Sequence, residues 1–270
     1  MFLKKSRLCM KYVYYPGCTL KTKAQELEKS ALESAETLGI KMVEQSQWQC
    51  CGAVYPLDDK EIASRLSVAR SLISAYSNDE KIVTLCSACH HLMKRINNDI
   101  KTKEEVRNKI NNYLENEVPY NGQGKVAHYL EVLRDDVTFS EIKNKVKNPL
   151  TGRRIGAYYG CLLLRPQEEM NFDNVENPKI IEDFIEALGG VAVKYPYRTE
   201  CCGGYLTINN KSLSDEMGDN ILKSALAHEI DEIVTACPLC KYNLEGKSSK
   251  IKITYFTELL SEALGGGENE

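Results

Sequence analysis

The chain has 270 residues, of which 43% are hydrophobic and 27% are charged, and its net charge is -3 at pH 7. These proportions exclude a disordered or collagen-like chain, and the length allows one large domain or two smaller ones, each with its own core. The lysines are interleaved with glutamates instead of forming a basic stripe, which excludes a nucleic-acid-binding protein.

The first half of the chain predicts strands that alternate with helices. A β-branched and aromatic run stops at Cys18, a helical stretch ends at Gly39, and a second apolar run leads to the CCG triplet at 50–52. A further helix is predicted over 58–76, and a third strand, 81–85, ends at a CxxC motif. Strands that alternate with helices pair in parallel, so an α/β architecture is expected.

A charged stretch and a linker separate this half from the next. Residues 101–125 predict an inserted helix and a turn, and 144–154, with Pro149 and Gly152, predict a linker. The predicted organisation is therefore a first domain over 10–149 that contains the insertion at about 101–125, a second domain over 150–266, and an N-terminal extension, 1–9, that carries Cys9.

The second half repeats the first. "RIGAYYGC" matches "KYVYYPGC", "TECCGG" matches "WQCCGA", and "EIVTACPLC" matches "KIVTLCSAC". The ends also agree, since "YFTELL" at 255–260 resembles "HYLEVL" at 128–133. Self-similarity of this kind indicates a duplicated structural unit. We therefore predict an α/β fold of two pseudo-symmetric units, each a small, mostly parallel sheet flanked by helices.

Ten of the eleven cysteines form two sets of five. The first set reads C-x31-CCG-x33-CxxC and the second C-x39-CCG-x33-CxxC. The first set is Cys18, Cys50, Cys51, Cys86 and Cys89, and the second is Cys161, Cys201, Cys202, Cys237 and Cys240. Each motif follows a predicted strand, and ligands in parallel sheets collect outside the carboxyl ends of the strands. Five sulfurs are therefore expected at one rim of each unit.

This number of thiols indicates metal or redox chemistry. No apolar run approaches the roughly 18 residues of a membrane span, and the start of the chain lacks the pattern of a signal peptide, so a cytoplasmic protein without a membrane span is expected. Structural disulfides are rare in a reducing cytoplasm. The cysteines are therefore expected to bind metal or to carry electrons.

Several kinds of site compete for these cysteines. Zinc takes four ligands where each set offers five, and a thioredoxin-like CxxC pair would leave three cysteines of each set without a role. "CSACH" at 86–90 also fits a haem-attachment motif, but Lys241 stands at the matching place in the second unit. An iron–sulfur cluster suits soft thiolates, and adjacent cysteines can reach neighbouring irons. Gly52 and Gly203 after each pair let backbone N–H groups turn toward sulfur.

With these motifs, the chain resembles the B subunit of heterodisulfide reductase, a member of the CCG-domain family. The resemblance covers residues 10 to about 264, and it is carried by the repeated cysteine pattern and by "GRRIGAYYGCLLLRP" at 152–166. It implies two noncubane [4Fe-4S] clusters, one on each set, with all ten cysteines as ligands. It also implies that the clusters face each other across a disulfide substrate, such as the mixed disulfide of coenzyme M and coenzyme B, which is cleaved to two thiols.

The resemblance implies partner subunits as well. The chain has no GxGxxG after a strand and no ferredoxin-type cysteine run, so its electrons are expected from elsewhere. In the family they come from a flavin-containing A subunit and a ferredoxin-like C subunit. Two alternatives stay open: an electron-transfer CCG subunit of a lactate, glycolate or succinate oxidoreductase, and a zinc-stabilised scaffold.

Two further side chains are candidates for substrate binding. Arg165 is placed either to bind an anionic group of the substrate or to form a salt bridge near the linker. His90 follows the first CxxC motif, either as a ligand or proton donor near the substrate or as a supporting or surface group. Structural roles are expected for Tyr14, Tyr15, Trp48, His128, Tyr158, Tyr159 and His228.

Overall fold

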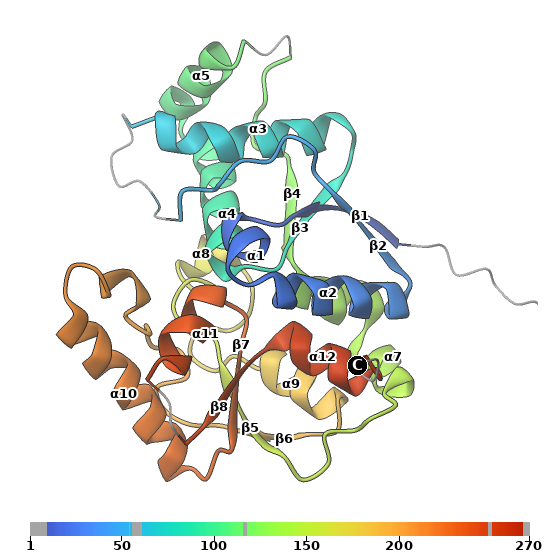
Figure 1. The fold of residues 1–270 in the computed structure, drawn as a ribbon. Helices are drawn as coiled ribbons and strands as arrows, with labels where there is room; N and C mark the ends of the chain where they lie inside the picture. The colour runs from blue at the N-terminus through green and yellow to red at the C-terminus, as the bar shows by residue number, and fades with distance from the viewer. Residues whose placement is uncertain (1–9, 54, 56–60, 116–117, 248–249, 267–270) are drawn as a thin grey trace, which may run out of the picture.

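The computed structural model describes residues 10–53, 55, 61–115, 118–247 and 250–266, which form two sheet-centred units packed side by side (Figure 1). Each unit has a four-stranded sheet in which every neighbouring pair of strands is parallel. The strand order is β2-β1-β3-β4 in the first sheet and β6-β5-β7-β8 in the second. The predicted α/β fold of two pseudo-symmetric units is therefore confirmed. The predicted extension with Cys9 lies outside the described residues.

The four strands of each unit alternate with helices in the same order, and the first unit adds α5 between β3 and β4. The first unit contains β1 (Met10–Tyr15), α1 (Cys18–Thr22), α2 (Gln25–Leu38), β2 (Ile40–Glu44), α3 (Ala63–Ser77), β3 (Lys81–Thr84), α4 (Ser87–Thr102), α5 (Glu104–Tyr113), β4 (Lys125–His128), α6 (Tyr129–Glu131), the π-helix η1 (Val132–Val137) and α7 (Phe139–Lys145). The second contains β5 (Arg154–Tyr158), α8 (Gln167–Met170), α9 (Ile180–Ala187), β6 (Val191–Val193), the 3-10 helix η2 (Gly204–Leu206), α10 (Lys211–Ala227), β7 (Glu232–Thr235), α11 (Pro238–Glu245), β8 (Lys252–Tyr255) and α12 (Phe256–Ala263).

Local sequence explains most of these boundaries. Helix α2 ends at Gly39, which adopts the left-handed conformation (φ 80°) that terminates helices and that glycine tolerates. The central strand β1 is buried over its last four residues, as expected for a parallel strand covered on both faces. Helix α5 lies within the segment 101–125 and projects from the rest of the first unit, at the top of Figure 1. No helix in the described part of the chain is both long and apolar enough to cross a membrane.

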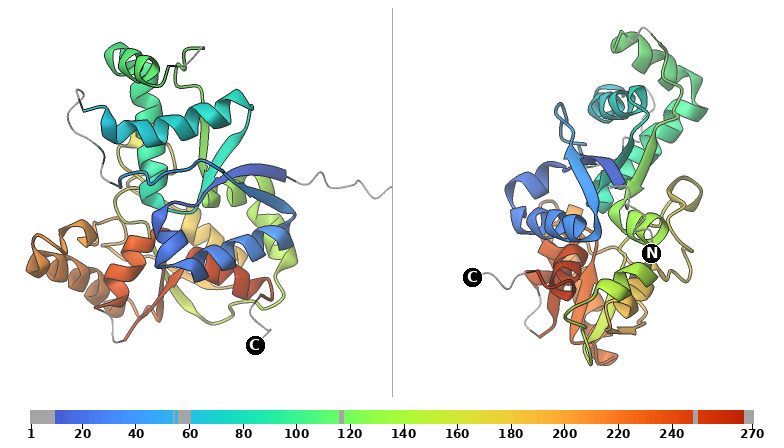
Figure 2. Two further views of the ribbon diagram at one scale, coloured as in Figure 1. Left: turned by 45° about the horizontal axis from the view of Figure 1, so that its top comes forward. Right: turned by 90° about the vertical axis from the view of Figure 1, so that its right-hand side faces the viewer.

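The two units exchange their last helices. Helix α12 of the second unit packs against α2 of the first, while α7, which closes the first unit, packs against α9 of the second (Figures 1 and 2). One hydrophobic core runs through this seam and joins Tyr12 and Leu27 of the first unit to Ile155 and Phe184 of the second. The units therefore share a core as well as a chain.

Phe256, at the start of α12, lies in the middle of the shared core. It is fully buried and contacts the rings of His128 and Tyr129 in the first unit and of Phe184 and Tyr255 in the second. Its side chain is thus part of the packing of both units at once.

We predict that Phe256→Ala lowers the free energy of unfolding by about 3–5 kcal/mol, the range for removing a buried phenyl ring. Because the core is shared, urea unfolding followed by circular dichroism should show one transition that shifts as a whole. The control is Leu226→Ala, at a partly exposed position on α10, where a change within about 0.5 kcal/mol is expected. Two separate transitions, only one of them moved by Phe256→Ala, would contradict the shared core.

Candidate functional site

The cysteine motifs lie at the carboxyl ends of the parallel strands, as the sequence predicts. Cys18 begins α1 directly after β1, and Cys86 caps the N-terminus of α4 directly after β3. The second unit repeats this arrangement, with Cys161 after β5 and Cys237 at the N-terminus of α11. The positive end of the α4 dipole favours a thiolate over a thiol at Cys86.

In the first unit four of the five cysteines line one cavity. The Sγ atoms of Cys51 and Cys89 are 3.4 Å apart. Together with Cys18 and Cys86 they line a cavity of about 310 Å³. Cys50 is exposed, and its pKa is raised by partial desolvation and by the neighbouring thiols of Cys18 and Cys51, which places it beside the other four. The first predicted set is therefore brought together in space.

The second set is packed more tightly. Its five cysteines line one space of about 10 Å³, and the Sγ atoms of Cys202 and Cys240 are 3.4 Å apart. Cys161 and Cys201 also lie close together, since their interaction raises the pKa of Cys161 and lowers that of Cys201. The structure thus brings together the members of both sets, and their role as cluster ligands stays a prediction.

The two sets meet at the seam between the units. Cys86 and Cys237 lie close enough to shift each other's pKa, with that of Cys86 lowered and that of Cys237 raised by their interaction. Beside them, Ser87 donates its backbone N–H (3.3 Å) and its hydroxyl (2.7 Å) to the carbonyl of Ala236. The Tyr255 hydroxyl lies between the carbonyls of Leu85 and Ala236, the residues that precede Cys86 and Cys237. These bonds fix one set relative to the other.

Glycine allows the first strand of each unit to approach the last cysteine of its set. Gly17 has φ 73°, and a Cβ built there would lie 2.8 Å from the Sγ of Cys89. Gly160, its counterpart, has φ 63° and would place a Cβ 3.4 Å from the Sγ of Cys240. A side chain at Gly17 would separate Cys18 from the rest of its set.

The glycines after the cysteine pairs behave as predicted. Gly52 and Gly203 have φ 86° and 77°, and their N–H groups point to the Sγ of Cys50 (3.5 Å) and of Cys201 (3.3 Å). Backbone N–H groups directed at sulfur stabilise the thiolate form.

A tyrosine supports the CCG loop in each unit. The Tyr15 hydroxyl donates to the carbonyl of Gln49, and the hydroxyl of its counterpart Tyr158 donates to that of Glu200 at 2.8 Å. Both acceptors directly precede a cysteine pair. Tyr15 and Tyr158 are buried in the core, as expected, and the structure adds this positioning role for their hydroxyls.

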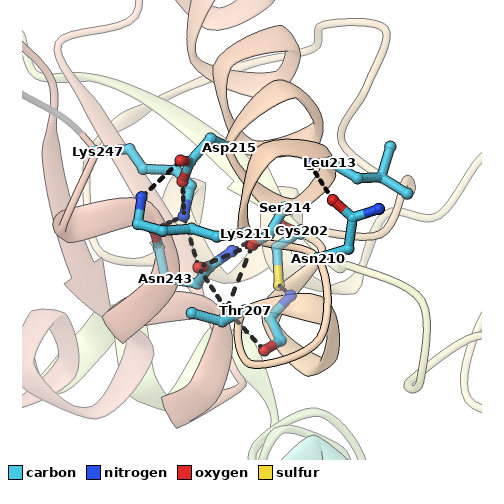
Figure 3. A network of polar contacts seen from close by, with 10 residues as sticks. Cys202, Thr207, Asn210, Lys211, Leu213, Ser214, Asp215, Asn243 and Lys247 are labelled. Atoms are coloured by element: carbon cyan, nitrogen blue, oxygen red, sulfur yellow. Dashed lines mark hydrogen bonds and ion pairs between the residues drawn. The ribbon is translucent and has the colours of Figure 1, made fainter.

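The second CCG loop has a further support that the sequence did not reveal (Figure 3). The buried Asn243 donates to the carbonyl of Cys202 at 2.6 Å, and its own amide oxygen accepts from Lys247 at 2.6 Å. Lys247 also pairs with Asp215 at 3.3 Å. Alignment of the CxxC motifs places Leu92 opposite Asn243, so this support is specific to the second unit.

The packed thiols cannot all ionise without a positive counter-charge. The pKa of Cys51 is lowered by a hydrogen bond from Cys89, while the pKa of Cys89 is raised because it shares protons with Cys51 and Cys86 and is buried. In the second set, the neighbouring thiol of Cys161 lowers the pKa of Cys201, while the pKa of Cys161 itself is raised. A cationic metal core would remove the repulsion between neighbouring thiolates.

The donor set therefore fits an iron–sulfur cluster in each unit, since all five donors are soft thiols and several irons give each sulfur a partner. Within the described ranges, no group of three or more His, Cys, Asp or Glu side chains has the arrangement of a single-ion site.

The two candidate substrate-binding residues lie outside the cavity lining. Arg165 donates to the carbonyl of Thr199 at 2.8 Å. His90 is fully buried, with Nε2 3.0 Å from a carboxylate oxygen of Glu131, so it is a supporting group and not a surface one. A contact of either residue with substrate stays a prediction.

The other residues expected to be structural divide into buried and exposed ones. Tyr14, Tyr159 and His128 are buried, Trp48 is partly buried, and His228 is exposed. The Nε2 atom of His128 forms a hydrogen bond of 2.9 Å with the carbonyl oxygen of Leu85.

Comparison with known proteins agrees with this geometry. The family described as "CCG: Cysteine-rich domain" matches the chain twice, over residues 12–94 and 155–245. The chain is 31% identical, over 94% of its length and 92% of the other protein, to the 8-methylmenaquinol:fumarate reductase membrane anchor subunit of Wolinella succinogenes. It is 26% identical, over 95% of its length and 90% of the other protein, to the B subunit of the Ferredoxin/F(420)H(2)-dependent CoB-CoM heterodisulfide reductase of Methanosarcina acetivorans.

Two further similarities extend the comparison. A protein of Archaeoglobus profundus, named for its likeness to the B subunit of heterodisulfide reductase, is 26% identical over 90% of this chain and 83% of its own length. The crystal structure of a hypothetical protein from Helicobacter pylori superposes with a TM-score of 0.70, at 12% identity, over 96% of this chain and 49% of the other. At that identity the likeness concerns the fold alone.

We predict that Asn243→Leu, which introduces the residue of the first unit, loosens the second CCG loop alone. Loss of the bond to the Cys202 carbonyl should lower the free energy of unfolding by about 1–3 kcal/mol. In the chain freed of metal, alkylation followed by mass spectrometry should show faster labelling of Cys201 and Cys202, with Cys50 and Cys51 unchanged. Lys211→Ala, which removes an exposed ion pair with Asp215 in the same region, is the control. Equal acceleration at both cysteine pairs would contradict a local role for Asn243.

Proposed function

Because the chain belongs to the CCG cysteine-rich-domain family, we propose that it is the iron–sulfur catalytic subunit of a heterodisulfide-reductase-type complex. The proposed reaction takes two electrons and two protons and cleaves one disulfide, R–S–S–R′, to two thiols. The observation that carries the proposal is the placement of two five-thiol sets at facing strand ends, beside a cavity lined by residues of both units.

The residues proposed to hold the clusters are the ten cysteines of the two sets. Each set would bind one noncubane [4Fe-4S] cluster, with the fifth thiol distinguishing it from a four-cysteine cubane. When bound, the clusters would supply electrons one at a time to a substrate that needs two.

Two residues of the second unit line the spaces beside both thiol sets. Leu239, which lies between Cys237 and Cys240, lines both the cavity and the space of the second set. Tyr205 of the second unit lines both as well, and its hydroxyl donates to the Ala53 carbonyl of the first unit at 3.2 Å. Tyr205 therefore links the two units at the cavity wall.

Electrons are proposed to come from partner subunits, because several of the similar proteins are themselves named as subunits. A flavin-containing A subunit and a ferredoxin-like C subunit are the partners that the family resemblance implies. The sequence itself carries neither a dinucleotide-binding motif nor a ferredoxin motif.

A second candidate function is electron transfer in a quinol-dependent fumarate reductase. It is favoured by the 31% identity to the Wolinella succinogenes subunit, which exceeds the 26% of the two heterodisulfide-reductase relatives named above. In that case the same two sets would pass electrons between partners, and the cavity would not need to bind a disulfide.

We predict that anaerobically prepared protein contains about eight irons per chain, as two four-iron clusters require, with a matching amount of sulfide. Cys51→Ala and Cys202→Ala should each remove about half of the iron, together with one of two electron paramagnetic resonance signals. The Cys9→Ser variant, which is changed outside both sets, should retain all of the iron. A colourless protein that contains zinc and no iron would establish the scaffold alternative instead.

We predict that the iron-loaded protein, with reduced viologen as the one-electron donor, reduces small disulfides and consumes two viologen radicals per disulfide. Cys51→Ala and Cys202→Ala should each lower the rate at least a hundredfold, while Cys9→Ser keeps it. A mixed disulfide between substrate and any of the ten cysteines would contradict cluster-based cleavage. If the protein reduces no disulfide but its clusters accept electrons from a naphthoquinol, the second candidate function is favoured.

A further inference from the structure

Tyr55, which lies just after the first CCG triplet, is held by one face of α4. Its hydroxyl donates to Asp99 at 2.5 Å, the Cζ atom of Arg95 lies 3.6 Å from the centre of its ring, and the His91 ring meets it edge-on at 6.4 Å. These three residues are spaced by four along the helix, so their side chains lie on the same face. Helix α4 therefore holds the first CCG loop through Tyr55.

Arg95 contacts the second unit as well. Its Nε lies 2.8 Å from a carboxylate oxygen of Glu169, and both side chains are only about a fifth exposed, at 21% and 22%. Glu169 belongs to α8, which follows Cys161 in the chain and packs against α4 (Figure 1). Leu162, the residue after Cys161, packs against the core of the first unit. One guanidinium group thus contacts both the first CCG loop and the segment that follows Cys161.

These contacts support cysteines that do not lie at a helix start. Cys86 and Cys237 cap the helices α4 and α11, whereas Cys51 lies in a loop and Cys161 in a turn. The tyrosine described above holds the first CCG loop before its cysteine pair, and Tyr55 holds it after the pair. The pair is therefore fixed from both sides.

The sequence of the second unit cannot repeat this arrangement. Leu206 stands opposite Tyr55 when the CCG triplets are aligned. Gly246 stands opposite Arg95 when the CxxC motifs are aligned. Leucine has neither a hydroxyl nor an aromatic ring, and glycine has no side chain. The contacts of Arg95 are therefore not a requirement of the fold that both units share.

We propose that Arg95 is a positioning residue that holds Cys51 and Cys161 in place as ligands of the two clusters. It does so by stacking on Tyr55 on one side and by pairing with Glu169 on the other. Arginine suits this double contact, because its planar guanidinium can stack on an aromatic ring while its N–H groups bind a carboxylate. The inference rests on the proposed iron–sulfur function and adds a supporting residue outside the ten ligands.

The first experiment measures alkylation of individual cysteines by mass spectrometry in the full chain freed of metal. Arg95→Met removes both contacts and keeps a long side chain, so labelling of Cys51 and Cys161 should become at least threefold faster. Labelling of Cys202, which has its own supports, should not change. The matched control is Arg154→Met, which removes a partly exposed arginine at the opposite end of β5 from the cysteines and should change none of these rates.

Two further variants separate the two contacts of Arg95. Glu169→Gln removes the ion pair and keeps the stacked ring, so it should accelerate labelling chiefly at Cys161. Tyr55→Leu removes the ring and keeps the ion pair, so it should accelerate labelling chiefly at Cys51. A general loss of stability would not divide the two cysteines in this way.

The second experiment is electron paramagnetic resonance on the iron-loaded full chain. Arg95→Met should broaden the signals of both clusters, because ligands that are held less firmly give a range of cluster environments. Arg154→Met should leave both signals as they are in the wild-type protein. Signals that Arg95→Met does not alter would overturn the proposal.

The labelling experiment decides the proposal without iron. Equal acceleration at Cys51, Cys161 and Cys202 in Arg95→Met would overturn it, because the change would then be a general loss of stability. Unchanged rates at Cys51 and Cys161 would overturn it too. If the wild-type protein binds no iron, the proposed function is wrong, and the labelling rates still show whether Arg95 holds the two segments.

Discussion

The reciprocal packing of two helices is the constraint on which the site depends. Because α12 of the second unit lies on α2 of the first, and α7 of the first lies on α9 of the second, neither unit can move without opening the shared core. Each CxxC motif lies at the start of a helix, α4 in the first unit and α11 in the second, next to the seam between the units. The distance between the two thiol sets is therefore set by core packing and not by the loops that carry the cysteines.

Polar contacts at the seam transmit this constraint to the sulfurs. Tyr255 ends β8 and begins α12, so its ring belongs to the shared core while its hydroxyl reaches the carbonyls before Cys86 and Cys237. His128 stands at the same place in the first unit and also holds the Leu85 carbonyl. The duplication thus supplied two equivalent supports, and both act at the point where the two thiol sets meet. A reaction that needs two redox groups at a fixed separation gains from such preorganisation.

Much of this arrangement could be predicted from the sequence. The alternation of strands and helices, the helix end at Gly39, and the gathering of each set at the strand ends all follow from local patterns that occur twice. The fourth strands, β4 and β8, were not predicted, because runs as short as "KVAH" and "KITY" carry too little periodicity. The helix exchange and the role of Asn243 were also missed. They depend on contacts between residues far apart in the chain, which no local pattern encodes.

The differences between the two copies explain why the cavity lined by the first set is larger than the space lined by the second. Alignment of the motifs pairs Pro16 with Tyr159 and Ala88 with Leu239. In the first unit the two smaller side chains line the open cavity, whereas in the second the larger two line a space of only about 10 Å³. Leu239 fills the space of its own set and at the same time forms a wall of the neighbouring cavity. A symmetric pair of units would have two cavities of equal size, so the asymmetry at these two positions accounts for the different space beside each set of thiols.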